Sequence, residues 1–328
     1  MRIIEQLNKL PINAGEYLVL PNMQTPYFII PLHSRNIFLN AIRLIKTKNT
    51  KGWIKKYLLQ RAPFFILKKI FPIITVKSRH LADETSQLIL PWNQDVCNKF
   101  TIFNFSNKNI SLIKIGFGKY RGMILNEYNS IINAVKYGKN VTPEILSFSE
   151  TNDFTIIETT FYKGIHPNEL PTSIIDFFDN IKSNSKEVKL IKHPYVSRIL
   201  KEILIVLEKE GFNCLLNTVH FYSKKYENEL VSIVLMHSDC SLTNVIETGG
   251  RDILIDWEEC VVDGAPIDVA YFDFRMRIDN GKSWSVNNVI DFLVVLHYIF
   301  LQIKHNNISH LTKISWESTE TDFSIIKI

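Results

Sequence analysis

The sequence predicts an α+β fold, in which a series of short strands is followed by a series of helices. Three apolar segments of strand length follow one another between residues 86 and 115. From residue 166 onward, apolar residues recur at the spacing of amphipathic helices. A chain that separates strands from helices in this way is typical of α+β proteins, and 328 residues can form two sizeable cores.

The composition indicates an ordinary folded protein in a reducing compartment. Hydrophobic residues make up 46% and charged residues 22% of the chain, which excludes a disordered polypeptide. Cys97, Cys214, Cys240 and Cys260 show neither a Cys-x-x-Cys pairing nor the spacing of a zinc site. The N-terminus lacks the apolar run of a secretory signal, and no segment reaches the roughly 20 apolar residues of a spanning helix. We therefore expect a cytoplasmic protein, or one held peripherally at the inner face of the membrane.

Formal charge is distributed unevenly along the chain. Residues 17–82 contain twelve Lys and Arg and no Asp or Glu, whereas residues 83–328 contain 24 basic and 31 acidic residues. Aromatic residues such as Trp53, Phe64 and Phe65 lie among these basic residues. The segment is compatible with a solvated basic face, with an anionic membrane surface as partner, or with nucleic acid. No recognition motif supports nucleic acid, which we do not expect as a partner.

The N-terminal region has predicted elements of its own. Residues 15–31 predict two short strands around a turn, and residues 35–46 and 52–60 predict two helices. Three further strands are predicted for residues 86–91, 100–105 and 110–115.

Lys114 lies in the middle of the third of these strands, ISLIKI. A lysine in an apolar strand is costly unless it is paired. Glu127 is the only acidic residue between Thr101 and Pro143, and it lies on a helix predicted for residues 123–135, so it is the expected partner. The alternative is a lysine on an edge strand that points to solvent.

The remaining strands and helices follow from periodicity. Strands are predicted for residues 144–148 and 154–160, and helices for residues 173–181, 195–210, 214–226, 267–277 and 286–303. His193, His220 and His297 are scattered among the helices, and we interpret them as packing or surface residues rather than ligands.

The strongest chemical signal begins where an apolar strand, Val231–Met236, leads to His237-Ser238-Asp239. Asn244 follows five residues after Asp239. Asp and Asn are common in surface turns, so this spacing alone is weak.

A predicted hairpin makes the spacing more specific. Val245-Ile246 and Ile253–Ile255 predict two short strands joined by a Gly249-Gly250 turn, and Asp256 lies where the second strand ends. If the strands pair, Asn244 and Asp256 are adjacent, and the preceding loop holds Asp239 beside them. Two carboxylates and an amide form an oxygen-rich site for Mg²⁺, with one carboxylate left to orient a hydroxyl.

At these residues the chain resembles a known family. His-x-Asp-x-x-x-x-Asn followed by Ile-Asp-Trp-Glu is similar to the signature of the aminoglycoside phosphotransferase and choline kinase family, whose members are relatives of the protein kinases. The resemblance implies a two-lobe protein kinase-like fold with a small antiparallel-sheet lobe and a larger, mainly helical lobe. Its parts would be a basic N-terminal extension (1–83), a small nucleotide-binding lobe (84–165) and a helical catalytic and substrate-binding lobe (166–328).

The resemblance also implies a role for each matching residue. Asp239 would be the catalytic aspartate that accepts or orients the substrate hydroxyl, and His237 would brace its loop. Asn244 and Asp256 would hold Mg²⁺. The nucleotide ATP would be held at its phosphates by Lys114 with Glu127, and at its adenine by backbone groups around Glu158, Thr159 and Phe161.

The chain departs from the family pattern in several places. Ser238 replaces a glycine and Ser241 replaces a common histidine, and we expect both to affect substrate choice more than chemistry. The loop that should cover the phosphates, Trp92–Lys99, contains no glycine. The glycine-rich stretch Gly116–Gly122 follows the lysine strand, so we interpret it as a connector. Downstream, Asp268 matches a structural aspartate that opens a helix and braces the catalytic loop.

The expected activity is ATP- and Mg²⁺-dependent transfer of a phosphoryl group to a hydroxyl of a small molecule or glycan. The acidic body favours a cationic acceptor, whereas the basic front end favours an anionic or lipid-linked acceptor, as in surface-polysaccharide metabolism. The alternative is a non-catalytic kinase-like module that binds a nucleotide or a partner.

Overall fold

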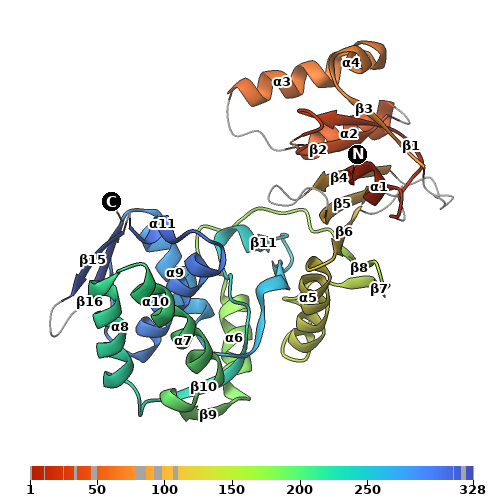
Figure 1. The fold of residues 1–328 in the computed structure, drawn as a ribbon. Coiled ribbons are helices and arrows are strands. Elements are labelled where there is room, and N and C mark those ends of the chain that lie inside the picture. The colour runs from red at the N-terminus through yellow and green to blue at the C-terminus, as the bar shows by residue number, and fades with distance from the viewer. Residues whose placement is uncertain are drawn as a thin grey trace. The chain divides into compact units, whose positions relative to one another are not determined.

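The computed structural model describes residues 2–10, 12–24, 26–32, 35–45, 50–77, 86–91, 98–105, 110–312, 314–318 and 323–327. The chain forms two compact units, and each has its own secondary structure (Figure 1). Residues 1–128 and 144–161 make the first, which we call the sheet unit. Residues 129–143 and 162–328 make the second, which we call the helical unit.

An antiparallel sheet is the centre of the sheet unit. In the described part of the chain it has eight strands, in the order β3-β1-β2-β4-β5-β6-β8-β7. The strands are β1 (Gly15–Leu20), β2 (Phe28–Pro31), β3 (Ile73–Val76), β4 (Ser86–Pro91), β5 (Lys99–Phe105), β6 (Ile110–Phe117), β7 (Ile145–Glu150) and β8 (Phe154–Thr160). Its helices are α1 (Arg2–Leu7), α2 (Arg35–Leu44), α3 (Thr50–Arg61), α4 (Phe64–Ile70) and the start of α5 (Tyr120–Val135).

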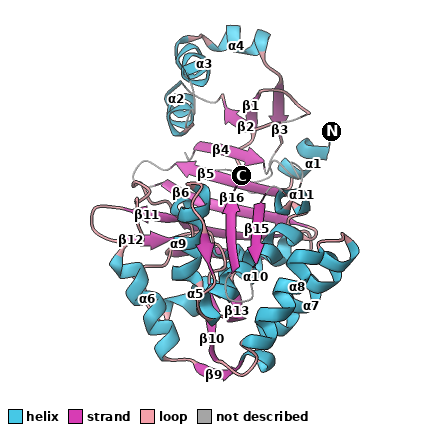
Figure 2. Cartoon of the chain, turned by 90° about the vertical axis from the view of Figure 1, so that its left-hand side faces the viewer, coloured by secondary structure: helices cyan, strands magenta, loops and turns pink. Residues whose placement is uncertain are grey.

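The N-terminal strands join this sheet instead of forming a separate extension. Alternate residues of β1 enter two different cores: Tyr17 and Val19 pack with α1, and Leu18 and Leu20 pack with α2 and α4. Strand β1 lies between β3 and β2, so it is an interior strand that is buried on both faces. The structure therefore differs from the expected boundary at residue 83, because β1, β2 and β3 share one sheet with the strands that follow. In both views α2, α3 and α4 lie at the end of the sheet that carries these strands (Figures 1 and 2).

Strand β6 lies inside the sheet, between β5 and β8. Lys114 is opposite Thr101 on one side and Ile157 on the other. The chain then turns directly into α5, and the start of that helix approaches β6 so closely that a Cβ atom on Gly116 would lie 2.3 Å from the carbonyl oxygen of Tyr120. The stretch from Gly116 to Gly122 is thus a strand end followed by a helix start, which confirms its interpretation as a connector.

The helical unit is built around α10, an apolar helix that is buried over most of its length. It packs against α7, α9 and α11. The helices of this unit are α6 (Thr172–Ser183), α7 (Pro194–Lys209), α8 (Asn213–Lys225), α9 (Asp268–Asp279), α10 (Val289–Lys304) and α11 (Ile308–Leu311).

Three small sheets complete the helical unit in the described part of the chain. Strand β10 lies between β9 and β13, β11 pairs with β12, and β16 lies between β14 and β15. Their bounds are β9 (Lys186–Lys189), β10 (Leu230–Met236), β11 (Val245–Glu247), β12 (Asp252–Leu254), β13 (Val261–Gly264), β14 (Trp284–Ser285), β15 (Ile314–Ser318) and β16 (Phe323–Lys327).

The predicted fold class is confirmed: an antiparallel-sheet unit and a larger, mainly helical unit make up the chain. Among the described residues, no helix combines the length and the apolar character that crossing a bilayer requires.

Replacing Gly116 with Ala tests the close contact between β6 and α5. The added Cβ must displace the backbone of Tyr120, so we expect the free energy of unfolding to fall by about 1–3 kcal/mol. Gly122→Ala is the matched control, because a Cβ there meets open space on an exposed face of α5. Alanine is the better helix former, so the control should gain up to about 1 kcal/mol. Urea unfolding of both variants measures this, and equal stabilities would contradict the assigned contact.

Candidate functional site

A hairpin brings Asn244 and Asp256 to neighbouring positions. Strands β11 and β12 pair with Val245 opposite Leu254, and the amide of Ile255 donates to the carbonyl of Asn244 at 2.8 Å. The hairpin turn includes Gly249 at φ +77°, in the left-handed region that glycine adopts without strain. The adjacency that the sequence predicts for these two residues is therefore present.

Asn244 also fixes the side chain of Asp239. Its Nδ2 donates to the Asp239 carbonyl oxygen at 2.8 Å and to Asp239 Oδ2 at 2.9 Å. The five-residue step between them is closed by a short 3₁₀ turn, η2 (Leu242–Asn244). Because the amide nitrogen makes both contacts, Asn244 Oδ1 points elsewhere, and neither it nor Asp239 Oδ1 accepts a hydrogen bond from the described residues.

The negative charge of Asp256 affects the pKa of Asp239. Burial and, to a smaller extent, the negative charge of Asp256 raise the pKa of Asp239 to about 6. Arg275 and the hydrogen bond from Asn244 oppose the shift. Two carboxylates that repel each other beside a free amide oxygen are a donor set that suits a divalent cation, because the cation would remove the repulsion.

The backbone at Asp256 is in the left-handed region, at φ 67° and ψ 57°. Aspartate tolerates this conformation better than most residues. The next residue, Trp257, is fully buried, and its Nε1 donates to the carbonyl of Leu254 at 2.7 Å. The tryptophan of the Ile-Asp-Trp-Glu segment therefore anchors the turn that presents Asp256.

His237 links the loop that leads to Asp239 to the hairpin. Its Nδ1 accepts from the Asp239 amide at 3.4 Å, so its Nε2 carries the proton and donates to the carbonyl of Ile255 at 2.9 Å. The ring is fully buried and packs edge-on against Trp257. His237 is thus placed to position Asp239 and not to touch a substrate.

Asp268 restrains the backbone of the two residues before Asp239. It is the first residue of α9, and its two carboxylate oxygens accept from the backbone amides of His237 and Ser238, both at 3.0 Å. Burial raises the pKa of Asp268 to about 7, and the two amide bonds partly offset this rise. The bracing role expected for Asp268 is confirmed by these contacts.

Ser238 occupies a strained, buried position. Its φ is 73°, and its hydroxyl is buried without a hydrogen-bond partner among the described residues. The sequence-based expectation that Ser238 affects substrate choice is not supported, because the side chain is enclosed by the protein. Glycine would adopt this left-handed conformation without the strain that a side chain brings.

His297 is a bracing residue that sequence reasoning missed. Its Nε2 donates to the carbonyl of Ser238 at 2.7 Å, and its Nδ1 accepts from the hydroxyl of Tyr195. Burial lowers the pKa of His297 to about 4, so the ring is neutral at physiological pH. No local sequence signal marks it, because its partners lie 59 and 102 residues away along the chain.

Arg275 is the second residue that the sequence did not reveal. It follows Asp268 by seven residues on α9, so both lie on one face of that helix. Its charge lowers the pKa of Asp239, and its guanidinium contacts the Tyr271 hydroxyl at 3.5 Å. The i, i+7 spacing from Asp268 is the only signal that could have indicated it.

The sheet unit contains the predicted ion pair. Lys114 Nζ lies 2.7 Å from Glu127 Oε1, and the two side chains are only 13% and 4% exposed. Because β6 is an interior strand, the alternative of a solvent-facing edge-strand lysine is excluded. The pairing is present, whereas its role in phosphate binding stays a prediction.

Near the predicted adenine contact, the backbone amides of Thr160 and Phe161 already donate hydrogen bonds to backbone carbonyls. The amide of Thr160 donates to the carbonyl of Glu144 at 3.0 Å, and the amide of Phe161 donates to the carbonyl of Ile110 at 3.1 Å. Glu158 and Thr159 lie within β8, which is paired on both sides. Adenine recognition at Glu158, Thr159 and Phe161 therefore remains a prediction, and it cannot use the Thr160 or Phe161 amide.

Most of the glycine-free loop lies outside the described residues. Residues 92–97 of the predicted phosphate loop lie outside the described residues, and Lys99 begins β5. Cys240, which follows Asp239, is buried, and burial raises the pKa of its thiol well above the usual value. It is a packing residue, as the sequence suggested.

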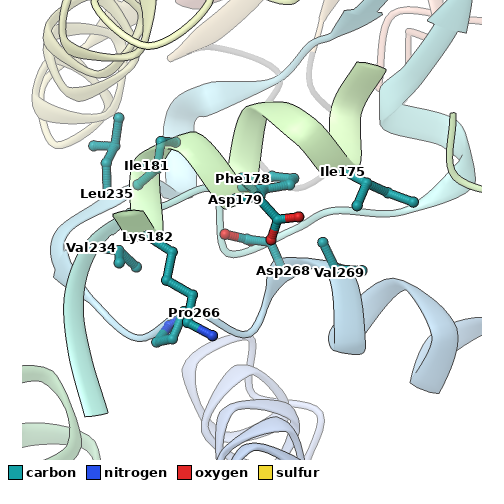
Figure 3. Close-up of a pocket in the computed structure, with 10 residues that line it drawn as sticks. All are labelled: Ile175, Phe178, Asp179, Ile181, Lys182, Val234, Leu235, Pro266, Asp268 and Val269. Carbon is teal, nitrogen blue, oxygen red and sulfur yellow. The ribbon is translucent and has the colours of Figure 1, made fainter. Parts of the chain in front are cut away.

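A cavity of about 120 Å³ lies between α6, the end of β10 and the start of α9 (Figure 3). Its walls come from α6, which contributes Asp179 and Lys182, and from the start of α9 around Asp268. Asp239, Asn244 and Asp256 do not line it. This cavity is therefore not the place where an acceptor hydroxyl would meet Asp239.

Comparisons with known proteins find similar structures. No family model matches the chain, and no curated protein matches its sequence. A spectinomycin phosphotransferase in complex with ADP and spectinomycin matches at 18% identity and a TM-score of 0.37, over 62% of this chain and 70% of that one. Aminoglycoside phosphotransferase APH(4)-Ia matches at 13% identity and a TM-score of 0.39, over 70% and 81% of the two chains. ADP-bound aminoglycoside phosphotransferase APH(2'')-Ib matches at 15% identity and a TM-score of 0.40, over 58% and 70%.

These solved structures belong to the same group of phosphotransferases that the sequence motif resembles. With identities below 25% and TM-scores below 0.5, they carry no conclusion about the activity of this chain.

Substitution of Ser238 separates backbone strain from the cost of its buried hydroxyl. Ser238→Ala removes the hydroxyl but keeps a Cβ at positive φ, and Ser238→Gly removes both. We expect the glycine variant to be more stable than the alanine variant by about 1 kcal/mol, the cost of a left-handed residue with a side chain. Urea unfolding measures both. An alanine variant as stable as the glycine variant would exclude strain at this position.

The pKa of His297 predicts a loss of stability in mild acid. The unfolded chain takes up a proton near pH 6.5, whereas the folded chain does so only near pH 4. Between these values the free energy of unfolding should fall by at most about 1.4 kcal/mol per pH unit as the pH is lowered. In His297→Gln this contribution is missing, so the stability difference from wild type should shrink from pH 7 to pH 4.

Chemical unfolding at a series of pH values checks this prediction. His220→Gln, on an exposed position of α8, is the control and should run parallel to wild type. A constant difference between wild type and His297→Gln would show that His297 is not buried in its neutral form.

Proposed function

We propose that this protein transfers the γ-phosphoryl group of ATP to a hydroxyl of a small molecule or glycan in a Mg²⁺-dependent reaction. One observation carries the proposal: Asp239 is held by Asn244, with the charge of Asp256 close enough to raise its pKa. A catalytic aspartate, an amide ligand and a carboxylate ligand are the parts that phosphoryl transfer needs at its acceptor side.

Asp239 has the geometry of the residue that receives the acceptor hydroxyl. Asn244 Nδ2 donates a hydrogen bond to Asp239 Oδ2, so Asp239 Oδ1 would accept the hydrogen of the hydroxyl. The hydroxyl oxygen forms a bond to the γ-phosphorus, the bond from that phosphorus to the bridging oxygen breaks, and ADP leaves. The hydroxyl proton passes to the Asp239 carboxylate. A pKa of about 6 keeps most of this carboxylate ionised at neutral pH.

Asn244 Oδ1 and the carboxylate of Asp256 would hold the metal. When bound, Mg²⁺ neutralises charge on the phosphate oxygens and orients them for in-line transfer. The fit rests on the oxygen donors and on the repulsion between Asp239 and Asp256.

In the sheet unit, Lys114 is the residue suited to the α- and β-phosphates. Its pairing with Glu127 keeps the ammonium group in one place within a largely buried setting. Positioning and charge neutralisation account for most of the catalysis in this reaction class.

The acceptor class follows from charge alone. The basic segment, residues 17–82, favours an anionic or lipid-linked acceptor, such as a glycan of surface-polysaccharide metabolism. The acidic balance of residues 83–328 is the observation in favour of a cationic acceptor such as an amino sugar.

A second candidate is a kinase-like module that binds a nucleotide or a partner without turnover. The absence of glycine from residues 92–99 favours it, because a glycine-rich loop is the usual cover of the phosphates. The intact set of Asp239, Asn244, Asp256 and Lys114 opposes it.

The test is transfer of labelled γ-phosphate from ATP to a panel of amino sugars, amino alcohols and glycans. Asp239→Asn should lower turnover by about 10²–10⁴-fold, because it removes the proton acceptor while keeping the size of the side chain. Asp256→Ala should also weaken the binding of Mg²⁺ with ATP while leaving the binding of metal-free nucleotide unchanged. Asp263→Ala is the control, since this half-exposed carboxylate contacts Arg198 at 3.4 and 3.5 Å and is not part of the proposed site.

Two results would reject catalysis. One is ATP turnover that is equal in wild type, Asp239→Asn and Asp256→Ala. The other is Mg²⁺-dependent nucleotide binding without transfer to any acceptor on the panel, which would support the binding module.

A further inference from the structure

The surface of helices α3 and α4 has no part in the proposed phosphoryl transfer. Trp53 and Leu58 of α3 are 60% and 59% exposed, and Phe65 and Ile70 of α4 are 65% and 64% exposed. Ile54, Tyr57 and Ile66 are exposed beside them. Single exposed apolar residues are common, but a group of this size on two successive helices indicates an interaction surface.

The exposed apolar residues of α3 form one stripe. At about 100° per residue, positions 53, 54, 57 and 58 fall within an arc of about 140° around the helix. Lys56 projects outside that arc, and its Nζ donates to the carbonyls of Arg43 and Ile45 at 3.0 and 2.6 Å. Because Lys56 fastens α3 to the end of α2, the apolar stripe faces away from the protein.

Ring contacts order this stripe. The ring of Trp53 stacks on that of Tyr57 with 5.7 Å between centroids, and the guanidinium of Arg61 lies 5.0 Å from the Tyr57 centroid. The three residues are spaced by four, so they form a row along the helix. An aromatic row that ends in a cation is preformed before any partner binds.

Helix α4 is held in a similar way. Leu67 is buried in the core beside the sheet, and Lys68 forms an ion pair with Glu16. Phe65, Ile66 and Ile70 lie on the remaining surface of the helix, and Lys69 is exposed among them.

The charge on this surface has one sign. Lys55, Arg61 and Lys69 are exposed beside the apolar residues, and residues 17–82 contain no Asp or Glu. We call the exposed set the α3–α4 face: Trp53, Ile54, Lys55, Tyr57, Leu58, Arg61, Phe65, Ile66, Lys69 and Ile70.

We propose that the α3–α4 face binds the surface of an anionic lipid bilayer. Tryptophan, tyrosine and phenylalanine side chains insert at the level of the head groups, and lysine and arginine contact anionic lipids. The aliphatic residues Ile54, Leu58 and Ile70 would leave water for the edge of the acyl region. This inference does not depend on the phosphotransferase proposal, because lipid binding is measured without nucleotide.

Charge and shape favour the bilayer over two other occupants. A symmetric second copy would bring Lys55, Arg61 and Lys69 against their own equivalents, and like charges repel. Nucleic acid would satisfy the cations and stack on Trp53, but it would leave the exposed aliphatic residues in water. A bilayer satisfies both kinds of side chain at once.

The experiment is sedimentation of the full chain with vesicles of phosphatidylcholine alone or with added phosphatidylglycerol. Trp53→Ser, Leu58→Ser and Phe65→Ser in one chain should reduce the binding of anionic vesicles by at least about 100-fold, through lost apolar burial. Lys55→Gln, Arg61→Gln and Lys69→Gln should reduce it by about 100-fold and weaken its salt dependence, at roughly fivefold per cation.

The matched control carries three exposed apolar substitutions on the helical unit. Ile191→Ser, Ile205→Ser and Val262→Ser remove side chains of similar exposure outside the face, and this variant should bind vesicles like wild type. Brominated lipids give a second readout: they should quench tryptophan fluorescence in wild type and much less in Trp53→Phe, a substitution mild enough to preserve folding.

Three outcomes would overturn the proposal. One is a wild-type chain that does not sediment with anionic vesicles. Another is a triple serine variant that binds them as tightly as the control. The third is a face whose substitution changes only self-association or only the binding of single-stranded RNA, which would assign it to a second copy or to nucleic acid.

Discussion

The buried carboxylate of Asp268 is the constraint on which the rest of the site depends. It accepts hydrogen bonds from the backbone amides of His237 and Ser238, the two residues directly before Asp239. Each hydrogen bond to a charged group contributes about 1.5–3 kcal/mol, and an unpaired buried carboxylate would be costly. The bonds therefore tie the start of α9 to one conformation of the loop. In that conformation Ser238 is forced to positive φ, and Asp239 is turned towards Asn244.

Two buried histidines complete this restraint from other directions. His237 joins the loop to the end of β12 through Ile255, and His297 joins it to α10 and, through Tyr195, to α7. Each ring uses one nitrogen as donor and the other as acceptor, so each must be neutral with a fixed tautomer. The carboxylate and the two rings restrain successive residues of one short loop. A loop restrained in this way is ordered before any ligand binds, and for the proposed phosphoryl transfer such preorganisation would lower the barrier.

The sequence could predict what is encoded locally. The hairpin of Asn244 and Asp256, the Lys114–Glu127 pair and most helices follow from periodicity, turn residues and the cost of a buried charge. What it could not predict depends on partners that are distant in the chain. The joining of the N-terminal strands to the sheet depends on the pairing of β2 with β4, and the bracing by His297 depends on α10 packing beside the loop. The pairing of β14 with β16, and the commitment of the Phe161 amide to Ile110, have the same character. Hydrophobic spacing indicates which face of an element is buried, but it does not indicate which element covers it.

Each unit contains a buried charge that is compensated by groups close to it. In the sheet unit Glu127 compensates Lys114, and in the helical unit two backbone amides compensate Asp268 while Arg275 and Asn244 moderate Asp239. Asp268 is thus held by backbone amides, and Lys114 is held by the carboxylate of Glu127. Loss of Glu127 would remove the carboxylate that lies 2.7 Å from Lys114 Nζ. Loss of Asp268 would remove the acceptor of the His237 and Ser238 amides, so the loop that leads to Asp239 would lose a restraint. In both places one buried carboxylate fixes a residue on which the proposed chemistry depends.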